Sequence, residues 1–258
     1  MEDTKLGKII SFSNQKGGVG KTTSAVNVAA SLGILGHKVL IIDLDPQGNA
    51  TSGVGIAKKN LKKTINDVLV GEATAEEAIL PTEYDNLSIL PANISLAGAE
   101  YNLYSGGGTE SIMKNALAPV KDKFDYIIID CPPSLSMLTV NAMVASDGVI
   151  IPMQCEFYAL EGLSQLTVTI NRIKANFNSN LNITGILITM YNSRLLLSLQ
   201  VMNELKKHYS DKLFNTQISR GVKVSEAPGF GMPVYYHDKR CKGAAEYLAV
   251  AKELASRI

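Results

Sequence analysis

A glycine-rich segment near the start of the chain has the composition of a phosphate-binding loop. Residues 14–23 read Asn-Gln-Lys-Gly-Gly-Val-Gly-Lys-Thr-Thr, between an apolar run and a helical pattern. Glycines let successive backbone N–H groups approach phosphate oxygens, and the start of a helix adds unpaired donors and a favourable dipole. Lys21 can neutralise β- and γ-phosphates, the Thr22 hydroxyl can ligate Mg²⁺, and Thr23 can donate to an α-phosphate. The segment therefore predicts a site for a nucleoside triphosphate and Mg²⁺.

This loop departs from the usual GxxxxGK[ST] pattern in two ways. Gln15 stands where the first glycine is expected, and a second lysine, Lys16, follows it. One phosphate site does not need two lysines for charge. Lys16 is therefore either a solvated surface lysine or a cation that points away from its own nucleotide, toward the phosphates of a second subunit. In the second interpretation it stabilises charge during phosphoryl transfer, as an arginine finger supplied in trans does.

Acidic residues follow two of the apolar runs. Asp43 and Asp45 occupy alternate positions, so they point to the same side of an extended chain, which suits a cation or a water molecule. A turn-capping role for this Asp-Leu-Asp-Pro sequence is the alternative. Asp130 ends the run 125–129 in the form of a Walker B motif, where an acid can hold Mg²⁺ through coordinated water. We therefore predict that Thr22, Asp45 and Asp130 form the metal site.

Short β-branched runs alternate with longer helical stretches along the chain, and this alternation predicts a doubly wound α/β fold. We expect strands at 8–13, 38–42, 87–91, 125–129, 148–152 and 183–189. We expect helices at 22–35, 135–145, 160–176, 196–208 and 243–257. Residues 53–63 and 105–108 are loop-like, but neither segment is long enough to link two domains. The prediction is a single P-loop NTPase domain over residues 1–258, with a twisted, mostly parallel sheet and helices on both faces.

Composition narrows the function classes. The chain has 258 residues and a formal charge of +1, which excludes a protein coated in basic charge but not a local basic face. Three isolated cysteines favour a reducing compartment. Residues 1–5 lack the order of a signal peptide, and no apolar run approaches the roughly 20 residues that span a bilayer. We expect a soluble, cytoplasmic protein that does not bind membranes.

The string Lys16–Thr23 resembles the deviant Walker A motif of the ParA/MinD family of P-loop ATPases. Further stretches extend the resemblance over nearly the whole chain, at residues 43–49, 90–92, 128–134, 154–162 and 224–228. Together they are more similar to the chromosomal, Soj-like ParA proteins than to MinD. The resemblance implies Mg²⁺-dependent ATP hydrolysis with slow intrinsic turnover. It makes Lys16, Lys21 and Asp45 catalytic, with Asp45 positioning the attacking water.

The same resemblance implies a set of nucleotide contacts. They are Lys16, Gly17, Gly18, Val19, Gly20, Lys21, Thr22 and Thr23 around the phosphates, with Met190, Ile218 and Ser219 around the adenine. Ser219 stands where the family commonly has a proline, so the base contact on that side differs from the family pattern. ATP is favoured over GTP because the chain has no guanine-reading NKxD motif.

The resemblance also implies DNA and protein partners. Arg194 and Lys223 align with residues that contact DNA without sequence preference in Soj-like proteins, and Arg220 lies between them in the sequence. Taken alone, these would be solvated surface charges. The implied cycle is a DNA-partitioning one, for a chromosome or a plasmid. An ATP-dependent sandwich homodimer binds nonspecific DNA of the nucleoid, and a ParB-like centromere-binding protein stimulates hydrolysis and releases it.

Other functions are weighed against this one. The first is a membrane-associated positioning ATPase of the MinD type, but residues 243–258 are alanine-rich and neutral, unlike a basic membrane-targeting helix. The second is a metabolic P-loop enzyme resembling dethiobiotin synthetase, for which no substrate-specific motif is present. An iron–sulfur cluster at Cys131 is disfavoured, because Cys155 and Cys241 do not provide the further ligands it would need.

Overall fold

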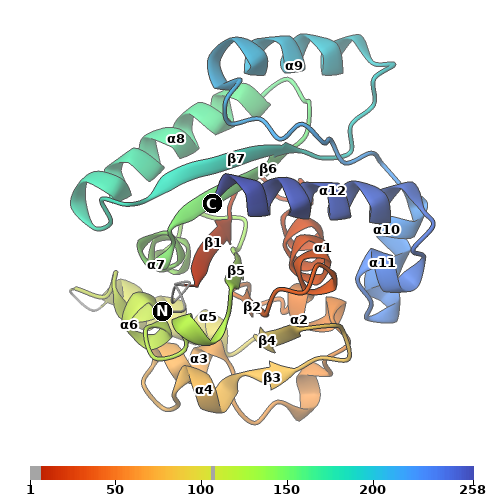
Figure 1. The fold of residues 1–258 in the computed structure, drawn as a ribbon. Coiled ribbons are helices and arrows are strands. Elements are labelled where there is room, and N and C mark those ends of the chain that lie inside the picture. The colour runs from red at the N-terminus through yellow and green to blue at the C-terminus, as the bar shows by residue number, and fades with distance from the viewer. Residues whose placement is uncertain (1–6, 106–107) are drawn as a thin grey trace, which may run out of the picture.

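The centre of the molecule is a twisted sheet with helices on both faces (Figure 1). The computed structural model describes residues 7–105 and 108–258, and the expected loop at 105–108 lies partly outside them. The described residues form seven strands in the order β3-β4-β2-β5-β1-β6-β7. Their bounds are β1 Lys8–Phe12, β2 Val39–Asp43, β3 Leu80–Pro81, β4 Leu87–Leu90, β5 Tyr126–Asp130, β6 Gly148–Met153 and β7 Asn182–Ile188. All neighbouring strands are parallel except the β3–β4 pair. The predicted α/β class is confirmed.

The six expected strands are present, each within one residue of its predicted ends. The short strand β3 was not predicted, because it has two residues, one of them a proline, and lies at the edge of the sheet. The segment that leads to Ser219 pairs with the β7 region at two isolated bridges, Ile186 with Leu213 and Tyr191 with Ser219. It therefore forms a partly paired border to the sheet.

Five long helices were predicted, and all five are present. They are α1 Lys21–Ile34, α7 Met137–Ala145, α8 Ala159–Asn176, α9 Leu196–Tyr209 and α12 Lys242–Arg257. The sequence patterns did not indicate the shorter helices, which are α2 Asn49–Gly53, α3 Ile65–Leu69, α4 Ala75–Ala78, α5 Leu96–Ser105, α6 Ile112–Leu117, α10 Val222–Glu226 and α11 Val234–His237. Three 3-10 turns complete the elements, at Lys58–Asn60, Lys121–Lys123 and Ala227–Phe230.

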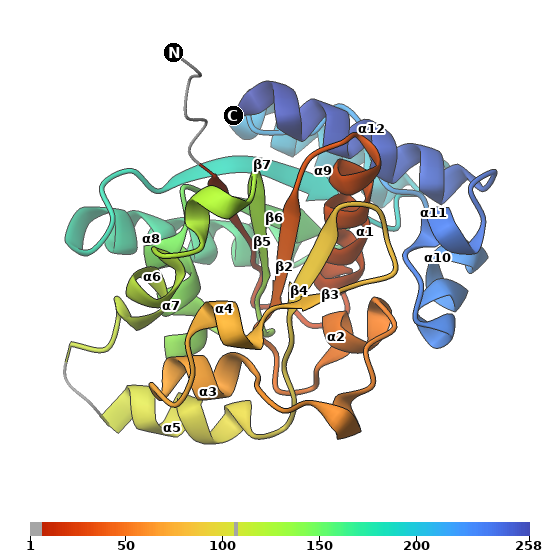
Figure 2. The same ribbon diagram turned by 60° about the horizontal axis from the view of Figure 1, so that its bottom comes forward.

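Along the inner strands, successive apolar side chains point to opposite faces of the sheet, and helices cover both faces. Ile10 and Phe12 of β1 belong to the same buried cluster as residues of α1 and α12. Ile9, the residue directly before Ile10, points to the opposite face and belongs to a second buried cluster with residues of α5, α6 and α7. Figures 1 and 2 show these two helix groups on opposite sides of the sheet. Successive side chains of a strand point to opposite faces, so a strand buried on both sides reads as a continuous apolar run.

The last helix packs on the core. Ala244, Tyr247, Val250, Ala251 and Leu254 of α12 are buried against α1 and the sheet. These positions recur every three or four residues, which places them on one face of the helix. Within the described residues, none of the helices combines the length and the apolar character that crossing a bilayer requires.

The sheet order brings three distant segments to one edge. Phe12, the last residue of β1, is aligned with Asp130 at the end of β5, and Asp130 is aligned with Asp43 at the end of β2. The glycine-rich loop leaves β1 at this same edge. Ligands of open parallel sheets bind outside the carboxyl ends of the strands, so this edge is where a site is expected.

Candidate functional site

The glycine-rich loop forms an open cradle between β1 and α1. Gly18 and Gly20 have φ values of +73° and +80°, in the left-handed region that side chains other than glycine rarely adopt. A Cβ atom on Gly17 or Gly18 would meet no atom within 4 Å, so packing is not the reason for glycine there. Gly20 precedes Lys21, the first residue of α1, whose early N–H groups have no partners within the helix. The loop can therefore bring backbone donors close to an anion.

Side chains from two neighbouring strands hold this loop in place. Asn14 donates to the carbonyl of Pro152 at 2.8 Å, and its side-chain oxygen accepts the N–H of Lys16. Gln154, after β6, donates to the carbonyl of Gly18 at 2.7 Å. Thr189, after β7, donates to the carbonyl of Val19 at 2.8 Å. These contacts fix the loop carbonyls from outside the cradle.

Lys21 is the cation inside the cradle. It is 7% exposed, and its ammonium donates to the carbonyl of Lys16 at 3.1 Å. Burial lowers the pKa of Lys21, and the nearby carboxylate of Asp130 opposes this effect. A buried ammonium with one neutral carbonyl partner would gain a much stronger partner from a phosphate oxygen.

Lys16 does not point into this cradle. Its ammonium forms an ion pair with Glu156 in the segment between β6 and α8, and both side chains remain about half exposed. The next two residues, Phe157 and Tyr158, are 75% and 71% exposed. The second lysine therefore lies at the surface beside two uncovered aromatic rings. Whether it reaches a second subunit stays a prediction.

Asp130 has the environment of a metal-site carboxylate. It is fully buried, and neither carboxylate oxygen has a hydrogen-bond partner of ordinary geometry among the described residues, although the Thr22 hydroxyl lies near enough to lower its pKa. Burial raises its pKa well above the usual range, the charge of Asp43 raises it further, and Thr22 and Lys21 act in the opposite direction. A buried acid without partners is costly unless a cation or water completes it. The residues present therefore fit Mg²⁺: the Thr22 hydroxyl and the Asp130 carboxylate would hold it, and the part of Asp45 in the metal site stays a prediction.

Asp43 and Asp45 have different environments, although both end the second strand. Asp43 is fully buried and accepts both the N–H and the hydroxyl of Thr51 at 2.7 Å. Asp45 is partly exposed, and its carboxylate accepts the N–H of Gln47 at 2.9 Å. Asp43 thus ties the following loop to the sheet, while Asp45 retains the accessibility that contact with a water molecule requires.

A cavity of about 410 Å³ adjoins the end of the glycine-rich loop. Five of the predicted nucleotide-binding residues line it, namely Gly20, Thr23, Met190, Ile218 and Ser219. Its wall also includes residues outside the predicted set of nucleotide contacts, namely Thr189, Arg220, Gly221, Val224, Ser225, Pro228 and Tyr247. Pro228 belongs to a stretch that carries the family resemblance, but nothing in the sequence points to Tyr247, which reaches the cavity from α12. The cavity is of a size and position to hold a nucleobase, and we call it the base cavity.

The predicted basic residues are only partly brought together. Arg194 and Arg220 line a groove of about 610 Å³, and Lys242 at the start of α12 joins them. Lys223 lies outside that groove on α10, where it pairs with Glu226 at 2.9 Å. Lys242 was not among the predicted DNA contacts, because its sequence neighbours give no sign that it lines the same groove as Arg194.

The cysteines show no sign of metal or redox chemistry. Cys131, Cys155 and Cys241 are free thiols, and Cys131 is buried. Burial raises the pKa of Cys131 and raises that of Cys155 to about 11, so both are protonated at neutral pH. Among residues 7–105 and 108–258, no three His, Cys, Asp or Glu side chains are clustered as ligands for a metal ion.

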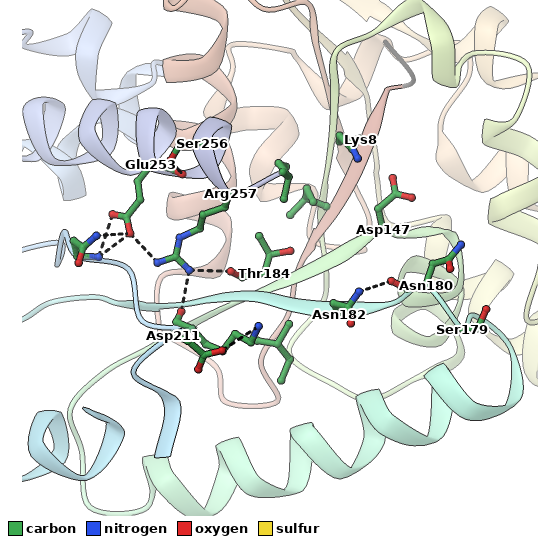
Figure 3. Close-up of a pocket in the computed structure, with 15 residues that line it drawn as sticks. Lys8, Asp147, Ser179, Asn180, Asn182, Thr184, Asp211, Glu253, Ser256 and Arg257 are labelled. Carbon is green, nitrogen blue, oxygen red and sulfur yellow. Dashed lines mark hydrogen bonds and ion pairs between the residues drawn. The ribbon is translucent and has the colours of Figure 1, made fainter. Parts of the chain in front are cut away.

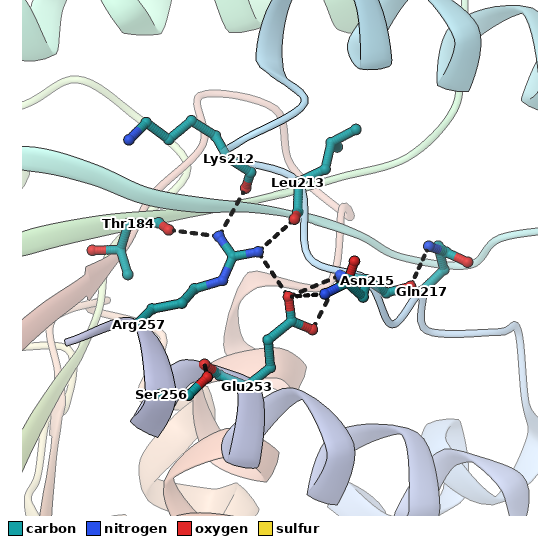
Figure 4. Close-up of polar contacts among 8 residues, drawn as sticks. All are labelled: Thr184, Lys212, Leu213, Asn215, Gln217, Glu253, Ser256 and Arg257. Carbon is teal, nitrogen blue, oxygen red and sulfur yellow. Dashed lines mark hydrogen bonds and ion pairs between the residues drawn. The ribbon is translucent and has the colours of Figure 1, made fainter.

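A larger cavity, of about 1000 Å³, lies at the opposite end of the strands (Figure 3). Lys8, Asp147 and Asn182 line it where β1, β6 and β7 begin. On its other side, Arg257 donates to the carbonyls of Thr184 and Lys212 at 3.0 and 3.3 Å and pairs with Glu253 at 2.7 Å (Figure 4). These contacts fasten the end of α12 to the sheet. The cavity is remote from the glycine-rich loop.

Comparison with known proteins gives the family. A family model described as an AAA domain matches residues 7–183. The sporulation initiation inhibitor protein Soj of Bacillus subtilis is 51% identical, over 97% of this chain and 99% of its own. The chromosome partitioning protein ParA of Myxococcus xanthus is 47% identical, over 98% of this chain and 89% of its own.

Two solved structures extend the comparison. A cobyrinic acid a,c-diamide synthase from Mycobacterium smegmatis, with bound ATP analogue and magnesium, is 36% identical and has a TM-score of 0.84. That likeness covers 97% of this chain and 95% of the other. The cell division ATPase MinD of Pyrococcus furiosus is 26% identical with a TM-score of 0.81, over 98% of this chain and all of the other.

Proposed function

The chain belongs to the AAA-domain family of ParA- and Soj-type P-loop ATPases, and on that premise we propose that it is a DNA-partitioning ATPase. One juxtaposition carries the proposal. The open glycine cradle after β1 lies at the same sheet edge as Asp130, a buried carboxylate without a hydrogen-bond partner of ordinary geometry among the described residues. Phosphate and Mg²⁺ together supply what these groups lack. ATP and Mg²⁺ are accordingly its cofactors.

The residues of the cradle and the neighbouring acids have separate roles in hydrolysis. The loop N–H groups and Lys21 hold the phosphates, and Thr22 and Asp130 hold Mg²⁺, which neutralises charge on the phosphate oxygens when bound. Asp45 orients the attacking water from its partly exposed position. Lys21 is the one cation that the described residues place inside the cradle, since the Lys16 ammonium is paired with Glu156. The transition-state charge on a lone subunit is therefore incompletely stabilised, and intrinsic turnover is slow.

Lys16 supplies the missing charge from a second subunit. In the single chain it is held by Glu156, next to the exposed rings of Phe157 and Tyr158. Exposed apolar side chains grouped beside a functional residue mark an interaction surface. We infer that ATP-bound subunits associate through this surface as a sandwich dimer. Each Lys16 then leaves Glu156 and contacts the partner's phosphates.

The dimer binds DNA without sequence preference. Arg194, Arg220 and Lys242 line one groove on each subunit, which keeps a net positive charge although Glu246 also lines it, and Lys223 adds a further charge on α10. Binding to phosphates depends steeply on the number of contacts, so pairing two subunits converts weak binding into retention on DNA. The protein is then cytoplasmic and nucleoid-associated in its ATP form. A ParB-like partner stimulates hydrolysis and releases it.

A MinD-like positioning ATPase on membranes is the alternative. Its membrane-binding element would have to be the last helix, but the apolar face of α12 is already buried against α1 and the sheet. Co-sedimentation with anionic liposomes in the presence of ATP, set against retention on DNA, separates the two functions.

Nucleotide-dependent retention on DNA tests the proposal. The protein is passed over immobilised nonspecific DNA with ADP, with ATP and with a slowly hydrolysed ATP analogue. Retention with the analogue and release with ADP support a partitioning ATPase. Equal retention in all three states, or binding to liposomes instead, would refute it.

A further inference from the structure

Ser219 lines both the base cavity and the groove that Arg194, Arg220 and Lys242 line. Its two hydrogen-bond donors point to one carboxylate. The N–H donates to Glu246 at 2.9 Å, and the hydroxyl donates to the other oxygen of Glu246 at 2.7 Å. Lys242 donates to the Ser219 hydroxyl oxygen at 2.8 Å and lies 3.4 Å from Glu246. The position of Ser219 is therefore set by a side chain of α12.

This anchoring matters because the surrounding segment has little regular structure. Near Ser219 the chain pairs with the β7 region through the bridge to Tyr191 and through Ile218, whose N–H donates to the carbonyl of Ile188 at 2.8 Å and whose carbonyl accepts the N–H of Tyr191 at 2.9 Å. Glu246 has a side chain that is 11% exposed, so its bonds compete little with water. A carboxylate that accepts two bonds from one residue fixes that residue's backbone in direction as well as in place. Glu246 therefore holds the wall of the base cavity at Ser219, next to the part that Ile218 fixes through its backbone.

A second glutamate of α12 makes the same kind of contact away from the cavity. Glu253, two helical turns further on, accepts the N–H of Asn215 at 3.0 Å and its side-chain amide at 3.0 Å (Figure 4). Asn215 and Glu253 line the large cavity at the opposite end of the strands and not the one beside the phosphate loop (Figure 3). The helix therefore holds one segment at two points, and of these two glutamates Glu246 is the one that contacts a residue of the base-cavity wall.

We propose that Glu246 is a positioning residue that sets how tightly the site holds the nucleobase and how well it selects adenine. This inference rests on the proposed ATPase function. Removal of the carboxylate leaves the Ser219 N–H without its acceptor and frees the cavity wall at Ser219, while Ile218 keeps its backbone bonds to Ile188 and Tyr191. The phosphate cradle is untouched, because its contacts come from Asn14, Gln154 and Thr189. Glu246 therefore acts on the base and not on the phosphates.

The experiment measures dissociation constants for Mg·ATP, Mg·GTP and inorganic triphosphate, each by competition with a fluorescent ATP analogue. Parent, Glu246→Ala, Glu246→Gln and Glu253→Ala are compared, with melting temperatures recorded for all. We expect Glu246→Ala to bind ATP about tenfold more weakly, to lose part of its preference over GTP, and to bind triphosphate as the parent does. Glu246→Gln retains one acceptor oxygen and should fall between the two. Glu253→Ala should bind ATP normally although its melting temperature falls.

Three results would overturn the inference. They are unchanged ATP binding by Glu246→Ala, equal losses of ATP and triphosphate binding, and a loss in Glu253→Ala as large as in Glu246→Ala. The last two would mean that α12 acts only on the stability of the fold. If the parent itself binds neither ATP nor triphosphate, the proposed function fails, and the inference fails with it.

Discussion

Thr51 links the loop after Asp45 to the sheet, and its replacement by valine should destabilise the protein by about 3 kcal/mol at neutral pH. Thr51 is fully buried, and its hydroxyl donates to Asp43 at 2.7 Å and accepts the N–H of Ala92 at 3.0 Å. A hydrogen bond to a charged group contributes about 1.5–3 kcal/mol, and a buried donor left unpaired costs about 1–3 kcal/mol. Valine has nearly the same volume, so no cavity adds to the loss.

The effect should depend on pH. Burial raises the pKa of Asp43 from 3.8 to about 6, and the two bonds from Thr51 oppose that rise. Because the folded state binds this proton more tightly than the unfolded state, Asp43 contributes stability below pH 4 that is lost as the pH rises through 6. That loss amounts to about 3 kcal/mol. Thr51→Val removes an opposing bond and raises the pKa further, so it should destabilise more at pH 8 than at pH 5.

Urea unfolding at pH 5 and pH 8 measures both effects. Thr51→Ser is the matched control, because it keeps the hydroxyl and loses only a methyl group. The prediction is a lower midpoint for Thr51→Val than for Thr51→Ser at both pH values, with the larger gap at pH 8. Equal midpoints for the two variants, or a gap that does not grow with pH, would refute the role given to the Asp43–Thr51 contact.

Two further predictions concern the steps of the cycle. Asp45→Ala should bind ATP as the parent does but release phosphate about a hundredfold more slowly, and rapid phosphate release would contradict its role in orienting water. Joint replacement of Arg194 and Lys223 by alanine should weaken retention on nonspecific DNA and reduce its salt dependence by roughly 0.9 per lost phosphate contact, with ATP affinity unchanged. Undiminished retention would place the DNA-binding face elsewhere.

The sheet and the phosphate loop were the parts most open to prediction. The inner strands are buried on both faces and therefore appear as continuous apolar runs, such as Tyr126–Asp130 with its burial at every position. The cradle is a local feature, because Gly18 and Gly20 take their conformations within one short segment. Short helices such as Ala75–Ala78 escaped prediction, since four residues carry too little periodicity to recognise.

Contacts between distant segments could not be read from the sequence. The partner of Lys16 in the single chain, Glu156, lies 140 residues away in the sequence. The sequence around Glu156 contains no pattern that predicts an ion pair with Lys16. The carboxylate that holds Ser219 comes from the last helix, whose spacing identifies only its buried face. The different roles of Asp43 and Asp45 likewise depend on Thr51, which donates two hydrogen bonds to Asp43. That contact forms only once the loop after Asp45 has folded back onto the sheet.

The mass of the protein in each nucleotide state tests the central claim most directly. Light scattering during gel filtration should give the 27.7 kDa monomer with ADP and a dimer with a slowly hydrolysed ATP analogue. Lys16→Ala should bind the analogue and remain a monomer. Its fold should persist, because a half-exposed ion pair contributes at most about 1 kcal/mol. A dimer of Lys16→Ala, or a parent that stays monomeric with the analogue, would contradict the account.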